Sequence, residues 1–253
     1  MSVYKNTPPI VTNGLVIYYD PANSQSIVSG SSLLTDISYT DKISGSLSAA
    51  AAYGTVSASY NSLYGGTLQF DGTSSYVNLD NSTAILFPSQ SAKSMFAWIN
   101  PTNADSTGIG DTRIIYLSPS GNSNNLTLTI SSTYPSSSAN STYVIGGTPD
   151  NNGHYGYTTT AFPLNQWAYV GWTFDGTNWM SYYNNTPYSS SNTASPITSF
   201  VFSVTGFFLG SRINNSSTFF PGLMGPIQMY NRGLSQAEVT LNYNAHKSRF
   251  NLT

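Results

Sequence analysis

Few side chains in this chain could carry out acid–base or nucleophilic chemistry. Among its 253 residues there are nine aspartates, one glutamate, two histidines and no cysteine. Hydrolysis of a glycosidic bond needs two carboxylates held about 5–5.5 Å or 6.5–9.5 Å apart. No two acidic residues have a spacing that would place them close together on one face of a strand. The sequence therefore predicts that the protein is not an enzyme.

The histidines add little to this catalytic inventory. A serine nucleophile needs a histidine base, and only His154 and His246 are available. No G-x-S-x-G elbow accompanies them. Two histidines without cysteine also make a zinc site improbable. His246 lies at the end of a predicted helix, where a structural role is favoured.

One polar and aromatic loop offers the best candidates for ligand binding. It contains Asn151, Asn152, His154, Tyr155 and Tyr157. Aromatic faces beside neutral hydrogen-bonding groups suit the recognition of sugars, so we expect a glycan-contacting site here. The alternative is an ordinary solvated loop. The larger aromatic residues are instead predicted to be core: Trp98, Trp167, Trp172 and Trp179.

Aspartates in predicted turns could bind calcium. Carboxylate, amide and carbonyl oxygens are the ligands that Ca²⁺ prefers. The sequence FDGT occurs at 70–73 and again at 174–177, which makes Asp71 and Asp175 the leading candidates, followed by Asp20 and Asp36. The alternative is that each aspartate only closes its own turn while the glycine supplies a positive φ.

The strongest predicted element is a β-hairpin over 164–188. Large residues recur at every second position in 168–174, and 175–178 is a cluster of turn formers. Aromatic and β-branched runs on either side of such a loop indicate two paired strands. Because the second strand is hydrophobic on both faces, we expect the hairpin to lie centrally in a sheet.

Short strands at regular spacing predict the fold class. They are expected at 14–20, 67–70, 76–79, 94–100, 113–118, 126–131, 143–145, 155–159, 200–204, 207–209 and 227–230. The strands at 67–70 and 76–79 are predicted to pair through 71–75. This pattern is typical of an all-β, two-sheet antiparallel jelly-roll sandwich.

One short C-terminal helix completes the prediction. Ser235 and Glu238 form a capping box, so the helix should run from there to about His246. Its basic end, with His246, Lys247 and Arg249, suits the helix dipole.

Composition limits the partners and the location of the protein. Charged residues make up 7% of the chain, with a net charge of −2, so nucleic acid is not an expected partner. No apolar run approaches the roughly 18 residues needed to span a bilayer. The first ten residues lack a hydrophobic signal core. We therefore expect synthesis in a cytoplasm without conventional export.

Four segments together resemble the laminin-G-like, concanavalin A-like jelly-roll family. Their order and spacing match that family over about 14–245. The segments are GTLQFDGTSSYVNLD (Gly66–Asp80), SMFAWINP (Ser94–Pro101), LNQWAYVGWTFDGTNW (Leu164–Trp179) and FPGLMGPIQMYNRGLSQAEV (Phe220–Val239). The resemblance implies the same jelly-roll fold.

The two ends resemble the version of this domain found in structural proteins of tailed phages and large viruses. They are NGLVIYYDPANSQS (Asn13–Ser26) and NYNAHKSRF (Asn242–Phe250). Two departures stand out. Gly225 and Pro226 replace an acidic pair that is common in the family, and Tyr169 replaces a histidine of its central strand.

These observations predict an extended N-terminal arm over 1–13 and one laminin-G-like jelly-roll domain over 14–253. The leading hypothesis is a non-catalytic virion surface protein, a capsid decoration or fibre component made in the host cytoplasm. The arm would bind other virion proteins, and the loops would be glycan-adhesive. We also expect a homo-oligomer or a place in a larger assembly. One alternative is a lectin-like carbohydrate-binding module without a virion role. Another, less favoured, is a glycoside hydrolase.

Overall fold

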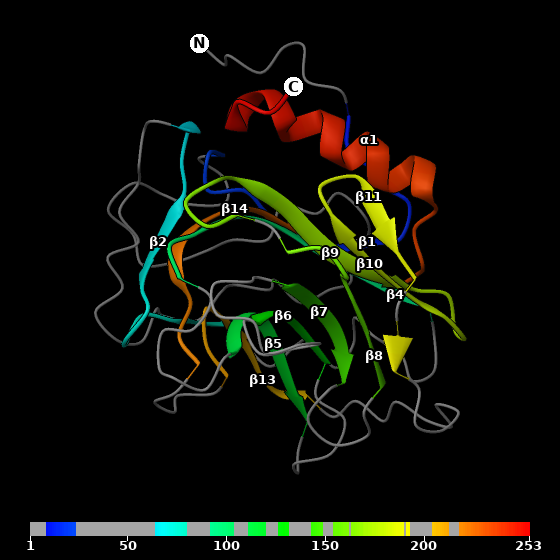
Figure 1. Cartoon of the computed structure of the whole chain (residues 1–253), viewed down its shortest axis with the longest axis horizontal. Helices are drawn as coiled ribbons and strands as arrows, with labels where there is room; N and C mark the ends of the chain where they lie inside the picture. Colours follow the sequence, from blue (N-terminus) through cyan, green and yellow to red (C-terminus); the bar gives the residue numbers. More distant parts are fainter. Residues whose placement is uncertain are drawn as a thin grey trace, which may run out of the picture.

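Two antiparallel sheets of seven strands each stack face to face (Figure 1). The structure is a computed structural model that describes residues 9–23, 64–79, 92–103, 111–119, 126–131, 143–148, 154–161, 163–189, 191–192, 204–212 and 218–253. The first sheet has the strand order β1-β14-β4-β9-β10-β11, and β2 also pairs with β14. The second has the order β12-β8-β7-β6-β5-β13-β3. This arrangement confirms the predicted jelly-roll sandwich.

Most strands are short, as expected, but β14 spans ten residues, whereas the sequence predicted only 227–230. The first sheet contains β1 (Leu15–Tyr19), β2 (Leu68–Asp71), β4 (Lys93–Pro101), β9 (Ala168–Phe174), β10 (Trp179–Tyr183), β11 (Thr186–Tyr188) and β14 (Pro221–Tyr230). The second contains β3 (Val77–Leu79), β5 (Asp111–Pro119), β6 (Leu126–Ser131), β7 (Tyr143–Thr148), β8 (His154–Tyr157), β12 (Ser191–Asn192) and β13 (Val204–Leu209).

The predicted hairpin is confirmed as β9 and β10. Trp179 pairs with Phe174 across the turn, and the register runs without a break to Tyr183 and Val170. β9 also pairs along seven residues with β4. It is therefore central, because each of its edges is hydrogen-bonded to another strand.

The predicted pairing of 67–70 with 76–79 is wrong. β2 pairs with β14 in the first sheet, whereas β3 pairs with β13 in the second. The turn between them starts at Asp71, whose carboxylate binds the next backbone amides, and continues through Gly72 at φ +74°. This turn carries the chain from one sheet to the other. The alternation of side chains was correct, but alternation does not identify the partner of a strand.

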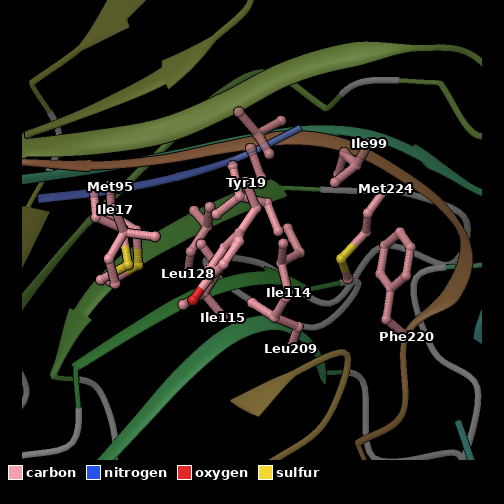
Figure 2. Packing of buried hydrophobic residues seen from close by; sticks show 14 of the residues in the cluster. Ile17, Tyr19, Met95, Ile99, Ile114, Ile115, Leu128, Leu209, Phe220 and Met224 are labelled. Atoms are coloured by element: carbon pink, nitrogen blue, oxygen red, sulfur yellow. The ribbon is translucent and has the colours of Figure 1, made fainter. Parts of the chain in front are cut away.

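A hydrophobic core fills the space between the sheets. Figure 2 shows Ile17, Met95, Ile99 and Met224 from the first sheet meeting residues such as Leu128 from the second. Trp172 and Trp179 belong to this core, with ring centroids 5.0 Å apart in an edge-to-face arrangement. The prediction that they are core residues is confirmed.

A second cluster lies on the outer face of the first sheet, beneath α1 (Gln236–His246) and the 3-10 helix η3 (Lys247–Phe250). The α-helix crosses above the strands of this sheet (Figure 1). Trp98 is fully buried here and stacks on Phe250 at 4.6 Å and on Tyr243 at 5.6 Å. Trp167 is also buried in this cluster. The predicted capping box at the start of α1 is present.

Residues 9–13 of the expected N-terminal arm lie against the domain. Val11 is buried; its N–H donates to Asn242 Oδ1 (2.8 Å), and its carbonyl accepts from the hydroxyl of Tyr230 (3.1 Å). The carbonyl of Asn13 accepts from Arg232 Nε (2.9 Å). Residues 1–8 lie outside the described part of the chain.

Within the described ranges, the structure contains no helix that combines the length and the apolar character required to cross a bilayer.

Candidate functional site

The outer face of the second sheet carries two rows of residues that cross neighbouring strands. On β6, Leu126, Leu128 and Ile130 fill the core, so the intervening threonines lie on the outer face. The first row holds, in register, Tyr155, Gly147, Thr127, Tyr116 and Phe208. The second holds Tyr157, Ile145, Thr129 and Arg113.

The surroundings of Gly156 show which face of β8 the two tyrosines occupy. A Cβ at Gly156 would lie 2.9 Å from Ser181 Oγ and 3.0 Å from Trp179 Cβ. Both of these atoms belong to β10 of the first sheet, so position 156 faces the core. Positions 155 and 157 therefore lie on the outer face. The structure brings these two predicted ligand residues to the same face, beside the threonines of β6.

The centre of this face is polar but closed to solvent. Arg113 Nη1 donates to Thr129 Oγ1 (2.7 Å), and the Thr129 hydroxyl donates to Thr127 Oγ1 (3.3 Å). All three side chains are buried, with Arg113 only 3% exposed. Tyr157, at the β8 end of its row, is half-buried. A ligand could therefore reach the face at β8, where an aromatic ring meets solvent.

The remaining predicted ligand residues do not share this placement. His154 occupies a register position opposite Thr148, with the parity of Gly156, and so belongs to the face directed at the first sheet. Asn151 and Asn152 lie outside the described residues. Of the predicted ligand residues that the structure describes, Tyr155 and Tyr157 share the outer face.

Asp71 uses its carboxylate to close its turn. Oδ1 accepts from the backbone amides of Thr73 (2.8 Å), Ser74 (2.8 Å) and Ser75 (2.9 Å), and Oδ2 accepts from Ser74 Oγ (2.6 Å). Partial desolvation opposes ionisation, but these hydrogen bonds outweigh it and hold the pKa of Asp71 well below its ordinary value.

Asp175 repeats this chemistry in the β9–β10 turn. Oδ1 accepts from the amides of Thr177 and Asn178, both at 2.7 Å, and Oδ2 accepts from Asn178 Nδ2 at 3.3 Å. The amide of Asn178 is the main cause of a lowered pKa for Asp175. The two FDGT segments therefore share a turn chemistry, as the alternative to calcium binding proposed.

The two calcium candidates cannot share one ion. Asp71 pairs with Pro221 of β14. The next residue of β14, Gly222, pairs with Pro101 at one end of β4. Asp175 follows Phe174, which pairs with Lys93 at the other end of β4. A nine-residue strand spans roughly 26 Å. Within the described ranges, no group of three or more His, Cys, Asp or Glu residues could hold a metal ion. Calcium at either turn alone stays a prediction, as does calcium at Asp20; Asp36 lies outside the described residues.

Glu238 and Asp20 form ion pairs with arginines. Arg232 binds Glu238 through two hydrogen bonds, Nη1 to Oε2 (2.9 Å) and Nη2 to Oε1 (2.6 Å). These bonds, with those from Ser235, lower the pKa of Glu238 to about 2. Asp20 is buried and accepts from Arg249 Nη1 at 2.7 Å.

His246 has a structural place at the end of α1, as the sequence favoured, but as a neutral ring and not as one charge of a basic end. Its side chain is buried, and desolvation lowers its pKa to about 4 despite the opposing field of Asp20. The ring is therefore neutral near pH 7. Its Nε2 lies 3.3 Å from the hydroxyl of Tyr18, which donates to Asp20 Oδ2 at 3.3 Å. Sequence reasoning missed this cluster because its members are more than 220 residues apart, and only the helical positions of His246 and Arg249 hinted at it.

The two departures from the family pattern have structural explanations. The hydroxyl of Tyr169 donates to Gln228 Oε1 (2.7 Å) beneath α1 and is fully buried. A Cβ at Gly225 would lie 2.7 Å from Phe250 Cζ and 3.1 Å from Trp98 Cβ. Positions 169 and 225 therefore serve the packing of the C-terminal helices.

A family profile matches residues 71–240, and its family is described as the concanavalin A-like lectin/glucanases superfamily. No curated protein sequence matches the chain significantly.

Several solved structures share the fold. Trypanosoma rangeli sialidase is 13% identical with a TM-score of 0.60, over 99% of this chain and 37% of its own. The binding domain of Paraclostridial Mosquitocidal Protein 1 is 13% identical with a TM-score of 0.60, and that of botulinum neurotoxin serotype D/C is 12% identical with a TM-score of 0.59. Each binding domain is matched over 92% of this chain and 52% of its own. The chain thus spans about a third to a half of these proteins, and at such identities the likeness concerns the fold alone.

Proposed function

The chain belongs to the concanavalin A-like lectin/glucanase superfamily, and we propose that it is a non-catalytic, glycan-adhesive domain carried on the surface of a virus particle. The single observation that carries the adhesive part is the placement of Tyr155 and Tyr157 on the outer face of the second sheet.

The proposal of a non-catalytic role rests on the carboxylates. Asp71 and Asp175 close turns at opposite ends of the first sheet, and Asp20 and Glu238 are held by arginines. A glycosidase would need one carboxylate with a raised pKa facing a second across a cleft. Hydrogen bonds instead lower the pKa values of Asp71, Asp175 and Glu238.

The proposed glycan site lies where the two rows of the second sheet reach β8. Tyrosine gives a rigid stacking surface with a hydroxyl at its end, which suits the apolar face and polar rim of a sugar ring. A site built on one or two tyrosines binds a single glycan weakly. Many copies on one particle would raise the avidity without new contacts.

The virion role is supported by the resemblance of the two ends of the chain to phage-type domains. Both ends pack on the first sheet, where Asn242 binds Val11 and Arg249 binds Asp20. The proposed glycan face belongs to the other sheet. Attachment through the first-sheet side would leave the second sheet directed outward.

Glycan binding can be tested with an array of neutral and acidic oligosaccharides, followed by titration of any ligand found. Tyr157→Ala should weaken binding about tenfold or more. Tyr188→Ala, which removes a half-buried tyrosine from β11 of the other sheet, is the matched control and should bind as the wild type does. No ligand on the array, or equal losses in both variants, would count against the glycan site.

Attachment through the N-terminus needs a truncation that leaves the domain intact. Residues 1–8 should be removed and 9–13 kept, because Val11 and Asn13 contact Asn242, Tyr230 and Arg232. Loss of co-sedimentation with particles, at an unchanged melting temperature, is the expected result. Undiminished association would remove the arm from the proposal. Glycan binding without particle association would favour a free carbohydrate-binding module.

A further inference from the structure

The C-terminal helices are held on the first sheet by the buried aromatic cluster around Trp98 and, at two ends, by ion pairs. At the start of α1, Glu238 binds Arg232, which also binds the carbonyl of Asn13. After its end, Arg249 of η3 binds Asp20 and the backbone carbonyls of Tyr64 and Gly66. Opening of this segment must therefore break both ion pairs and expose the aromatic cluster.

The two attachments differ in burial. In the Arg232–Glu238 pair the side chains are 26% and 30% exposed, whereas in the Arg249–Asp20 pair they are 7% and 11% exposed. The stability of a buried ion pair depends on its partner charges and hydrogen bonds, because neither ion can be solvated by water. The end near His246 is therefore the more sensitive to a change of charge.

The groups around the His246 ring come from β1, the residue after it, and η3. The hydroxyl of Tyr18 lies 3.3 Å from Nε2, and this hydroxyl donates to Asp20, which is paired with Arg249. Behind Tyr18 lies Tyr230 of β14, whose hydroxyl binds Asn242. The adjacent Lys247 has its Nζ 6.0 Å from the centre of the Tyr243 ring. Among the described residues around the His246 ring, the acidic side chain is that of Asp20.

A proton on His246 would place a second cation beside Arg249 in this buried cluster, with one carboxylate to serve both. Burial lowers the pKa of His246 to about 4, from 6.5 in an exposed ring. An open state binds the proton near pH 6.5 and the closed state only near pH 4. The neutral ring thus favours the closed state above pH 6.5, and this preference is lost as the pH falls from 6.5 to about 4.

The surface beneath the helices contains buried donors that the closed state leaves unused. Trp98 Nε1 and Gln228 Nε2 have no hydrogen-bond partner among the described residues, although both side chains are fully buried. Buried donors without a partner destabilise the closed state relative to a hydrated one. Opening would hydrate both groups, which offsets part of the cost of exposing the aromatic rings.

We propose that α1 and η3 form an acid-released clasp: protonation of His246 in its cluster with Tyr18, Asp20 and Arg249 detaches residues 236–250 from the first sheet while the sandwich stays folded. Release exposes the aromatic outer face around Trp98 and frees the segment before β1, whose Val11 is held by Asn242. The clasp acts independently of glycan binding on the second sheet.

Amide hydrogen exchange of the full chain, measured by mass spectrometry between pH 7 and 4.5 and corrected for intrinsic rates, tests this proposal. The open fraction of 236–250 should rise by up to about tenfold for each pH unit below 6.5, while β4 and β9 keep their protection. His246→Gln, which retains a donor for Tyr18 without a titrating group, should abolish this rise. His154→Gln, at the other histidine of the chain, should leave it unchanged.

The proposal is overturned if 236–250 shows no pH dependence, or if β4 and β9 lose protection together with it. An unchanged rise in His246→Gln would also overturn it. If that variant does not fold, the wild type still decides: its two histidine ring signals can be titrated by NMR. A His246 midpoint well below 6.5 supports the clasp, and two midpoints near 6.5 overturn it.

Discussion

The two outer faces of the sandwich are built differently. The outer face of the first sheet is aromatic and covered by α1 and η3, with Trp98 stacked between Tyr243 and Phe250. The outer face of the second sheet carries threonines and Arg113 and ends at Tyr157 on β8. Both sheets share one inner core (Figure 2). One face is thus covered by the C-terminal helices, whereas the other has a buried polar centre and a half-buried tyrosine on β8.

This difference explains why a chain with so many aromatic residues need not use the largest of them for binding. Trp98 and Trp172 are fully buried, on opposite sides of the first sheet. The indole of Trp172 donates to the carbonyl of Thr127 (2.9 Å) and so links the two sheets. In the proposed function, recognition falls to Tyr155 and Tyr157 of β8, and the ring of Tyr157 is half-buried.

The largest expected effect comes from removing an aromatic side chain on each face. Trp98→Ala should lower the free energy of unfolding by about 3–5 kcal/mol, because it leaves a cavity beneath α1. Tyr157→Ala should cost about 1 kcal/mol, because that ring is half-buried. Urea denaturation of both variants gives the comparison, and similar losses would remove the distinction between the faces.

The buried ion pair provides the next test. Arg249→Met should destabilise the fold by about 3 kcal/mol, since it leaves the carboxylate of Asp20 buried without its cation. Arg232→Met, in the half-exposed pair with Glu238, should cost about 1 kcal/mol or less. Thermal unfolding monitored by circular dichroism would measure both. A larger loss in Arg232→Met would contradict the assignment of the tighter attachment to the η3 end.

Two glycines distinguish the aromatic face from an exposed turn. A Cβ at Gly171 would clash with the Phe96 ring and the Met95 carbonyl, so Gly171→Ala should cost about 2–3 kcal/mol. Gly176, in the β9–β10 turn, has φ +106° and open space around it. Gly176→Ala should therefore cost only the backbone strain, about 1 kcal/mol. Equal unfolding midpoints for the two variants would show that the aromatic stack tolerates a shift of Phe96.

The smallest effect is expected at the aspartate turns. The low folded-state pKa values of Asp71 and Asp175 stabilise the fold above pH 3.8, and this contribution is lost as the pH falls through them. Because both turns are exposed, Asp175→Ala should cost about 1 kcal/mol or less. Wild-type melting temperatures with calcium and with a chelator should agree. A rise of several degrees with calcium that is absent in Asp175→Ala would establish a metal site.

Much of the fold could be predicted because local patterns encode it. Alternation in 168–174 identified the inner face of β9, and the Ser235–Glu238 capping box identified the start of α1. The placement of β2 and β3 in different sheets could not be predicted, because the partner of a strand depends on contacts with residues far away in the sequence.

The candidate site was predicted only in part. Sequence composition suggested Tyr155 and Tyr157, but the register of β6, β7 and β8 was needed to place them beside Thr127 and Thr129. The burial of His246 was missed because a basic residue at a helix end satisfies the dipole rule equally well when it is exposed.

The central claim is that the second sheet recognises the ligand while the first face serves stability. Amide exchange with and without a saturating glycan, at pH 7, tests both faces in one experiment. The account predicts slower exchange in residues 154–157 and no change in 236–250. Protection of 236–250, or unchanged exchange in 154–157 with the glycan bound, would contradict it.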